Sequence, residues 1–131
     1  MKGAAVKTGV DYRFDFIMLP KINRLKAVRD FKKVFNGGKT SENELIKIRF
    51  LRNSKTHSRF GFVVSNIFAS KAAARNLIKR RLRAAACFLL KDVKPGFDVV
   101  IWPKSALKKS AYETILSSFK DILIENDILF V

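Results

Sequence analysis

The stretch AAARNLIKRRLRAAACFLL, Ala72 to Leu90, places five Lys or Arg residues and one Asn among otherwise mostly apolar side chains. At about 100° per residue, the apolar and the polar positions separate onto opposite sides of a helix. The pattern therefore predicts one long amphipathic helix, roughly residues 70–91, with its apolar side on a core. The apolar side consists of Ala74, Leu77, Ile78, Leu82, Ala85, Phe88 and Leu89, and the polar side of Arg75, Asn76, Lys79, Arg80 and Arg83.

The polar side of this helix is almost purely cationic, since no acid lies between Lys71 and Lys91. Like charges four residues apart destabilise a helix, and Arg75, Lys79 and Arg83 form such a ladder. A polyphosphate ligand would relieve the repulsion through charge-assisted hydrogen bonds to the guanidinium groups. The alternatives are a merely solvated surface and a basic helix on a membrane, and the second would leave the strands of the chain uncovered.

Two further helices are predicted by apolar residues at three- and four-residue spacing. Asn23 is the expected N-cap of the first, which ends at Gly37 and Gly38. Ser110 and Glu113 have the spacing of a capping box at the start of the second. Their inner positions are Leu25, Val28, Phe31, Val34 and Phe35 in the first, and Ile115, Leu116, Phe119, Ile122 and Leu123 in the second.

Three segments have the patterns of strands. Residues 44–52, ELIKIRFLR, and 59–65, RFGFVVS, place apolar side chains on alternate positions, and the short link between them predicts antiparallel pairing. Residues 98–102, DVVIW, form a continuous apolar run that is typical of a central strand. The order helix, strand, strand, helix, strand, helix predicts a small α+β fold in which helices cover a sheet.

The composition points to a polyanionic partner. The chain has 131 residues, which fits one domain, and 27 Lys and Arg against 11 Asp and Glu give a net charge of +16. The single Cys excludes an intrachain disulfide and, with a single His, a Cys/His zinc site. No signal-peptide run or membrane span is found, so the sequence predicts a cytoplasmic protein that binds nucleic acid and no membrane.

With these residues in view, the chain resembles the bacterial ribonuclease P protein component. RNLIKRRLR, Arg75 to Arg83, is similar to the arginine-rich signature of that family. Three further stretches match in the same order. RLKAVRDFKKVFNGGK resembles the opening helix, RFGFVVS the strand before the signature helix, and FDVVIWPKSALKKSAYETI the last strand, loop and closing helix. The resemblance covers about residues 22–125.

The resemblance implies a two-layer α-β sandwich with three helices and a mixed sheet of four strands. The signature helix would connect two strands in a left-handed βαβ crossover, whereas most such crossovers are right-handed. The fourth strand is expected to be short and to lie around residues 39–42. A single RNA-binding domain of the ribonuclease P protein type would span residues 21–131, after an N-terminal arm at residues 1–20.

The resemblance also implies a function. Ribonuclease P is a ribonucleoprotein endonuclease that removes the 5′ leader of precursor tRNA. Its RNA subunit performs the hydrolysis with Mg²⁺, while the protein subunit binds this RNA and the leader. The implied partners are therefore ribonuclease P RNA and precursor tRNA, and no catalytic residue and no metal site are expected in the protein.

The candidate binding residues match the motifs of the family. Those expected to face the ribonuclease P RNA are Arg75, Asn76, Lys79, Arg80 and Arg83, together with Lys71. Those expected at the cleft for the leader are Phe31, Phe35, Phe50, Ser65 and Tyr112. Aromatic rings stack on bases with little regard to sequence, which suits varied leaders. The helical spacing of Phe31 and Phe35 fits the core equally well.

The chain departs from the family pattern at two places. Leu77 stands where the signature usually has a third cation, which predicts the loss of one RNA contact. Asn66 and Ile67 stand where two lysines usually follow Ser65, which predicts weaker leader or metal contacts, with Lys71 as the expected compensation.

Two other functions compete with this interpretation. A different RNA-binding protein of similar fold, such as a ribosomal protein, would share the basic helix. A stand-alone nuclease would need clustered carboxylates or a His-based acid/base pair. The lone His57 lies in a polar turn and the acids are scattered, so the sequence favours a binding protein over a nuclease.

Overall fold

The computed structural model describes residues 19–130, which form three α-helices and a four-stranded sheet. The predicted α+β class, with three helices and a mixed four-stranded sheet, is confirmed. The N-terminal arm predicted at residues 1–20 lies, except for its last two residues, outside the described part. The elements are η1 (Lys21–Asn23), α2 (Val28–Gly37), β1 (Lys39–Glu42), β2 (Ile46–Arg52), β3 (Arg59–Phe62), α3 (Ala72–Leu89), η2 (Leu90–Asp92), β4 (Phe97–Pro103), η3 (Ser105–Lys109) and α4 (Tyr112–Glu125).

The strands lie in the order β1-β2-β4-β3. β2 pairs antiparallel with β1 and with β4, and β3 pairs parallel with β4. The prediction that β2 and β3 pair with each other is therefore wrong, because β4 lies between them. β4 has five consecutive buried residues and needs a neighbour on each edge, which the two flanking strands provide. α3 is the crossover between the parallel strands β3 and β4, and the expected short strand at residues 39–42 is β1.

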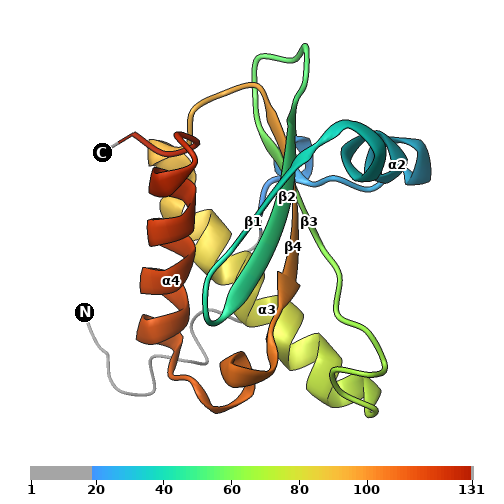
Figure 1. Ribbon diagram of the computed structural model, residues 1–131, viewed down its shortest axis with the longest axis vertical. Helices are drawn as coiled ribbons and strands as arrows, with labels where there is room; N and C mark the ends of the chain where they lie inside the picture. The colour runs from blue at the N-terminus through green and yellow to red at the C-terminus, as the bar shows by residue number, and fades with distance from the viewer. Residues whose placement is uncertain (1–18, 131) are drawn as a thin grey trace.

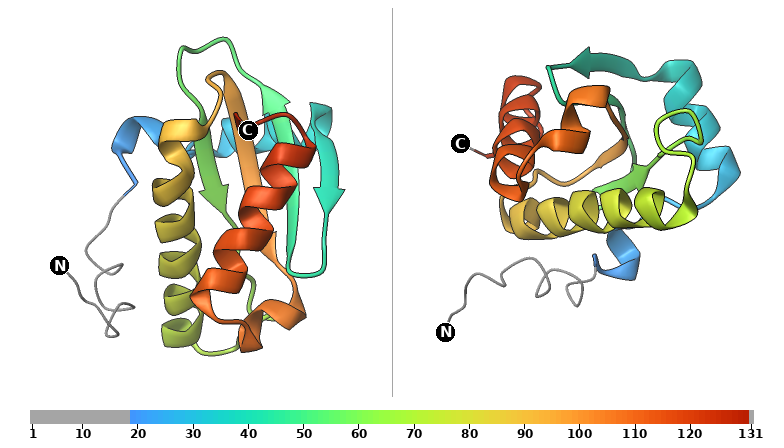
Figure 2. Two further views of the ribbon diagram at one scale, coloured as in Figure 1. Left: turned by 90° about the vertical axis from the view of Figure 1, so that its left-hand side faces the viewer. Right: turned by 90° about the horizontal axis from the view of Figure 1, so that it is seen from below.

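Helices cover both faces of the sheet. α3 and α4 pack together on one face, and the shorter α2 lies against β2 and β4 on the other (Figure 1). Successive β4 side chains alternate between the two sides. Val99 and Ile101 join the main core with α3 and α4, whereas Val100 and Trp102 pack towards α2. A second view shows α3 running along the sheet beside α4 (Figure 2).

The ends of the helices differ in part from the predictions. Asn23 does not cap α2 but is buried in η1, where its amide donates a hydrogen bond to the Ser58 carbonyl at 2.8 Å. The Ser110 hydroxyl donates to the Ala106 carbonyl at 3.0 Å, and α4 begins after Ala111 with no side-chain cap. The end of α2 is as predicted, with the Gly38 N–H donating to the Val34 carbonyl at 2.9 Å. Within residues 19–130, no helix is both long and apolar enough to cross a membrane.

Candidate nucleic-acid interface

α3 presents the predicted RNA-binding residues along its solvent side. In the described part of the chain, neither Lys79 nor Arg83 forms an ion pair with an acid. The repulsive ladder expected from the sequence is therefore not neutralised by acids elsewhere in residues 19–130. Lys71, Asn76, Arg80 and Arg83 are exposed, and Arg75 and Lys79 are half-buried.

Arg75 also has a structural role that the sequence did not indicate. Its guanidinium donates hydrogen bonds to the carbonyls of Ala69 and Ser70, at 2.9 and 2.8 Å. Ser65, at the other end of the same turn, accepts a hydrogen bond at its hydroxyl from the Phe68 N–H at 3.2 Å. These bonds fix the loop between β3 and α3, so Ser65 belongs to this loop.

A further cation, Arg24, adjoins the basic side of α3. Burial and the nearby Arg24 charge together lower the pKa of the Arg83 guanidinium. Arg24 pairs with the edge of β3 through an isolated bridge to Phe60, and the next N–H, of Leu25, donates to the Phe60 carbonyl at 2.9 Å. The segment that leads into α2 thus adds a guanidinium beside α3. No local pattern in the sequence signals this neighbour, since 59 positions separate Arg24 from Arg83.

The buried side of α3 differs in part from the predicted apolar side. Ile78, Leu82 and the three alanines 84–86 are buried. Leu77 and Phe88, assigned to the apolar side, are 37% and 57% exposed. The Leu77 side chain therefore lies at the surface and not in the core, contrary to its predicted place on the apolar side.

Three rings form an aromatic surface between α2 and the sheet, namely Phe31, Phe35 and Trp102. The Phe31 and Phe35 ring centroids are 6.1 Å apart, and Phe35 and Trp102 are 5.8 Å apart. Phe35 is 41% exposed, and the Lys47 ammonium lies 5.4 Å from the centroid of the Trp102 ring. Phe31 is partly buried and its ring lies over Gly61. It therefore belongs both to the core under α2 and to the aromatic surface.

Phe50 and Tyr112, also predicted for the leader cleft, lie at the main core and away from the aromatic surface. Phe50 shares the face of Ile46 and Ile48, because strand side chains alternate, and its ring packs 6.3 Å from that of Phe97. Tyr112 is buried in the core at the start of α4, where burial raises the pKa of its phenol to about 12. Neither residue joins the aromatic surface. Trp102 supplies the aromatic ring from the sheet, although its sequence pattern indicated only a place in a strand.

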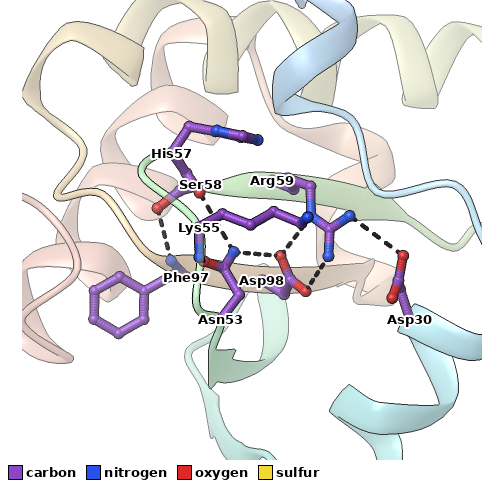
Figure 3. Close-up of polar contacts among 8 residues, drawn as sticks. All are labelled: Asp30, Asn53, Lys55, His57, Ser58, Arg59, Phe97 and Asp98. Atoms are coloured by element: carbon purple, nitrogen blue, oxygen red, sulfur yellow. Dashed lines mark hydrogen bonds and ion pairs between the residues drawn. The ribbon is translucent and has the colours of Figure 1, made fainter.

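An ion-pair network ties the start of α2 to the sheet (Figure 3). Arg59 on β3 donates two hydrogen bonds to the Asp98 carboxylate on β4, at 2.8 and 2.7 Å, and one to Asp30 on α2, at 3.2 Å. The hydrogen bond to Asp98 is the main cause that raises the Arg59 pKa. Arg59 thus engages both oxygens of the Asp98 carboxylate, and Asn53 donates a further hydrogen bond to Oδ1 at 2.7 Å.

The other end of α2 is held by Arg49 on β2. Its guanidinium donates to the carbonyls of Val34 and Phe35, both at 3.0 Å, and to the Thr40 hydroxyl at 2.5 Å. A cation at the last carbonyls of a helix also complements the helix dipole. The two arginines hold the helix that carries Phe31 and Phe35 at both ends.

The described residues offer groups that can bind nucleic acid, and several of their carboxylates are already paired. No group of three or more His, Cys, Asp or Glu side chains within residues 19–130 is placed to hold a metal ion. Asp98 and Asp30 are paired with Arg59, and Glu42 is paired with Lys104 at 2.6 Å. Guanidinium groups, an exposed amide and aromatic rings are the donors and stacking partners that single-stranded nucleic acids use.

Comparison with known proteins gives one consistent result. The ribonuclease P family matches residues 19–126. A ribonuclease P protein component of Picosynechococcus sp. is 36% identical over 110 residues, covering 84% of this chain and 95% of that protein. The component of Clostridioides difficile is 32% identical, with 81% of this chain and 96% of that protein covered.

Solved structures agree with the sequence matches. The RNase P protein of Thermotoga maritima superposes with a TM-score of 0.72 at 31% identity, covering 78% of this chain and 96% of that one. An RNase P protein structure from Staphylococcus aureus has a TM-score of 0.74 at 22% identity, covering 82% and 97%, which is a likeness of fold.

Proposed function

The chain belongs to the ribonuclease P protein family and functions as the protein subunit of that enzyme, and we propose how it binds its RNA partners. The solvent side of α3 binds the RNA subunit. The aromatic surface binds the 5′ leader of precursor tRNA, and the protein works in the cytoplasm.

The unneutralised cations of α3 are the observation that carries the first part of this proposal. Lys79 and Arg83 lie one turn apart and have no acidic partner within residues 19–130. Adjacent Arg24 adds a third charge, whose proximity contributes to the lowered Arg83 pKa. A phosphate backbone along α3 would replace these repulsions with charge-assisted hydrogen bonds.

The aromatic surface supports the second part. An exposed Phe35 beside Trp102 offers two ring faces, and Lys47 offers a cation next to them. Stacking of a base on an aromatic ring contributes about 1–3 kcal/mol and depends little on the base. This chemistry suits a leader that differs from one precursor tRNA to the next.

In this proposal the chemistry of cleavage is carried by the RNA subunit with Mg²⁺. The described carboxylates of the protein do not fit a magnesium site, because they are paired with cations or lie apart from one another. The contribution of the protein is to place the leader and to lower the repulsion between two RNA molecules.

The test is cleavage of a precursor tRNA at low Mg²⁺ by a bacterial ribonuclease P RNA, with and without the protein. Cleavage at the mature 5′ end is expected only when both subunits are present. Tight RNA binding without any rescue of cleavage would contradict the proposal.

Two variants separate the two surfaces. Lys79→Ala/Arg83→Ala should weaken binding of the RNA subunit and reduce the slope of log affinity against log salt by about one unit per lost phosphate contact. Phe35→Leu should leave that slope unchanged and weaken only precursor tRNA with a leader, relative to mature tRNA. Loss of both properties in either variant would show that the surfaces are not separate.

A further inference from the structure

η3 and the loop that precedes α3 lie at the same end of the molecule (Figure 2), and η3 carries a second group of unneutralised cations. Lys108 and Lys109 are exposed, and neither forms an ion pair within residues 19–130. Glu113, the acid nearest to them along the chain, is not paired with either. Lys104, just before η3, is different, because Glu42 neutralises it at 2.6 Å.

Contacts connect these lysines to the basic side of α3. The Lys108 ammonium lies 4.8 Å from the centroid of the Phe68 ring. Phe68 is packed against the main core, and the next two carbonyls accept hydrogen bonds from Arg75. The β3–α3 loop is therefore a fixed bridge between η3 and α3, with a lysine held on one side and an arginine on the other.

The loop itself and the start of α3 contain only cationic or uncharged side chains. Lys71 is exposed directly before α3, and the first turn of α3 contains no acid. Ile67 is 98% exposed and adds no charge. The free N–H groups at the start of a helix carry a partial positive charge, which adds to that of the lysines.

We propose that Lys108 and Lys109 extend the RNA-binding surface of α3 across the β3–α3 loop, and that each binds one phosphate of an RNA backbone. This inference rests on the proposed function of α3. Lys is a compact charge that binds phosphate without reading bases, and the Phe68 ring limits the positions that the Lys108 side chain can take. The η3 lysines would thereby supply positive charge that Asn66 and Ile67 do not supply on the loop.

The first experiment measures affinity for ribonuclease P RNA between low and moderate salt. Lys108→Ala/Lys109→Ala should reduce the salt slope by roughly 0.7–0.9 per lost contact. The matched control is Lys104→Ala/Lys120→Ala, which removes the same net charge but changes one lysine already paired and one exposed on α4. The control should keep the slope of the parent protein, and an equal loss in both pairs would overturn the proposal.

The second experiment tests the location of the charge. Ile67→Lys in the Lys108→Ala background places an ammonium on the neighbouring β3–α3 loop, at a position that is 98% exposed, and it should restore the lost affinity. Ser117→Lys in the same background, at an exposed position of α4, should not restore it. Restoration by both would overturn the proposal in favour of a non-specific effect of net charge.

Separate titrations identify which RNA the η3 lysines bind, and they test this proposal independently of the one for α3. Titrations with ribonuclease P RNA alone and with precursor tRNA alone show which backbone the η3 lysines bind. A reduced slope for Lys79→Ala/Arg83→Ala with no change for the η3 pair would defeat this inference while the proposed function stands. No change in either pair would defeat both. A third titration uses anionic phospholipid vesicles, and a variant that loses binding only to these vesicles would overturn the proposal in favour of a membrane.

Discussion

At the scale of single residues, the contact between Phe31 and Gly61 joins the core to the aromatic surface. A Cβ atom on Gly61 would lie 2.5 and 2.7 Å from two atoms of the Phe31 ring. Gly61→Ala should therefore lower the free energy of unfolding by about 1–3 kcal/mol, as overpacking does elsewhere. Urea unfolding of Gly61→Ala, Phe31→Leu and the double variant measures this.

The double variant distinguishes a clash from a loss of backbone freedom. If the ring is the obstacle, the cost of Gly61→Ala should be much smaller in the Phe31→Leu background, which gives a favourable coupling between the two sites. Strictly additive costs would show that the Ala side chain is disfavoured for another reason.

The buried phenol of Tyr112 predicts how the stability of the protein depends on pH. Burial, with smaller contributions from Cys87 and Glu113, raises its pKa to about 12, whereas the phenol of the unfolded chain titrates near 10. The folded state therefore keeps a proton that the unfolded chain releases. The stability from this group is complete below pH 10 and is lost as the pH rises towards 12, by up to about 2 kcal/mol.

The two tyrosines of the chain, Tyr12 and Tyr112, can be followed by absorbance of the phenolate. One late titration step near pH 12 is expected in the folded protein, and Tyr112→Phe should remove it. The same variant should flatten the alkaline loss of stability. Part of the alkaline loss of stability should persist in Tyr112→Phe. Burial also raises the pKa of the Cys87 thiol, so this group too keeps a proton in the folded state that the unfolded chain releases. A late step that survives Tyr112→Phe would contradict the assignment.

At the scale of elements, the placement of α2 depends on a shared arginine. Asp98 accepts two hydrogen bonds from Arg59 and a third from Asn53, whereas Asp30 accepts one, at 3.2 Å. Asp98→Asn should cost about 3 kcal/mol of unfolding free energy, because Arg59 is left partly buried and without its main partner. Asp30→Asn should cost about 1 kcal/mol, from one hydrogen bond and one favourable charge at a helix start.

Urea denaturation of the two Asn variants checks this order. Asp30→Asn should in addition weaken binding of leader-containing precursor tRNA more than binding of ribonuclease P RNA, because α2 carries Phe35. Equal costs for the two substitutions would mean that Arg59 pairs with both acids alike.

The sequence predicted those elements whose pattern is local. The period of α3 and the apolar run of β4 were sufficient for their types and approximate bounds. The position of β4 between β2 and β3 could not be predicted from the short link after β2, because pairing is decided by which strand needs two neighbours. The hand of the α3 crossover stays a prediction of the resemblance.

The residues of the candidate site were likewise predicted only where the pattern is local. A helical wheel identified the basic side of α3, because one helix carries all of its members. Phe50 was correctly grouped with Ile46 and Ile48 on one face of its strand, but alternation along a strand does not tell which helices cover that face. Trp102, Arg24 and the loop-fixing role of Arg75 depend on segments far apart in sequence or on backbone geometry, which no local pattern contains.

At the scale of the whole molecule, the dominant property is a charge of +16 on 131 residues. Few of the cations are neutralised within residues 19–130, where the ion pairs of lysine are the exposed Lys104–Glu42 and Lys94–Asp127. The field of such a protein accelerates association with a polyanion and also opposes the compact state. The charge that serves RNA binding should therefore reduce the stability of the free protein.

Added salt should then stabilise this protein against urea, since salt screens exposed charges and hardly affects buried pairs. An increase from low to moderate NaCl should raise the free energy of unfolding by about 1 kcal/mol, the sum of several like-charge pairs of a few tenths each. Lys79→Glu is the most informative variant, because it replaces the charge repulsion of Lys79 with Arg75 and with Arg83 by two attractions. It should raise stability at low salt and reduce the gain from added salt. Stability that falls with NaCl would show instead that the few ion pairs outweigh the repulsion, and the basic side of α3 would then need no RNA to relieve it.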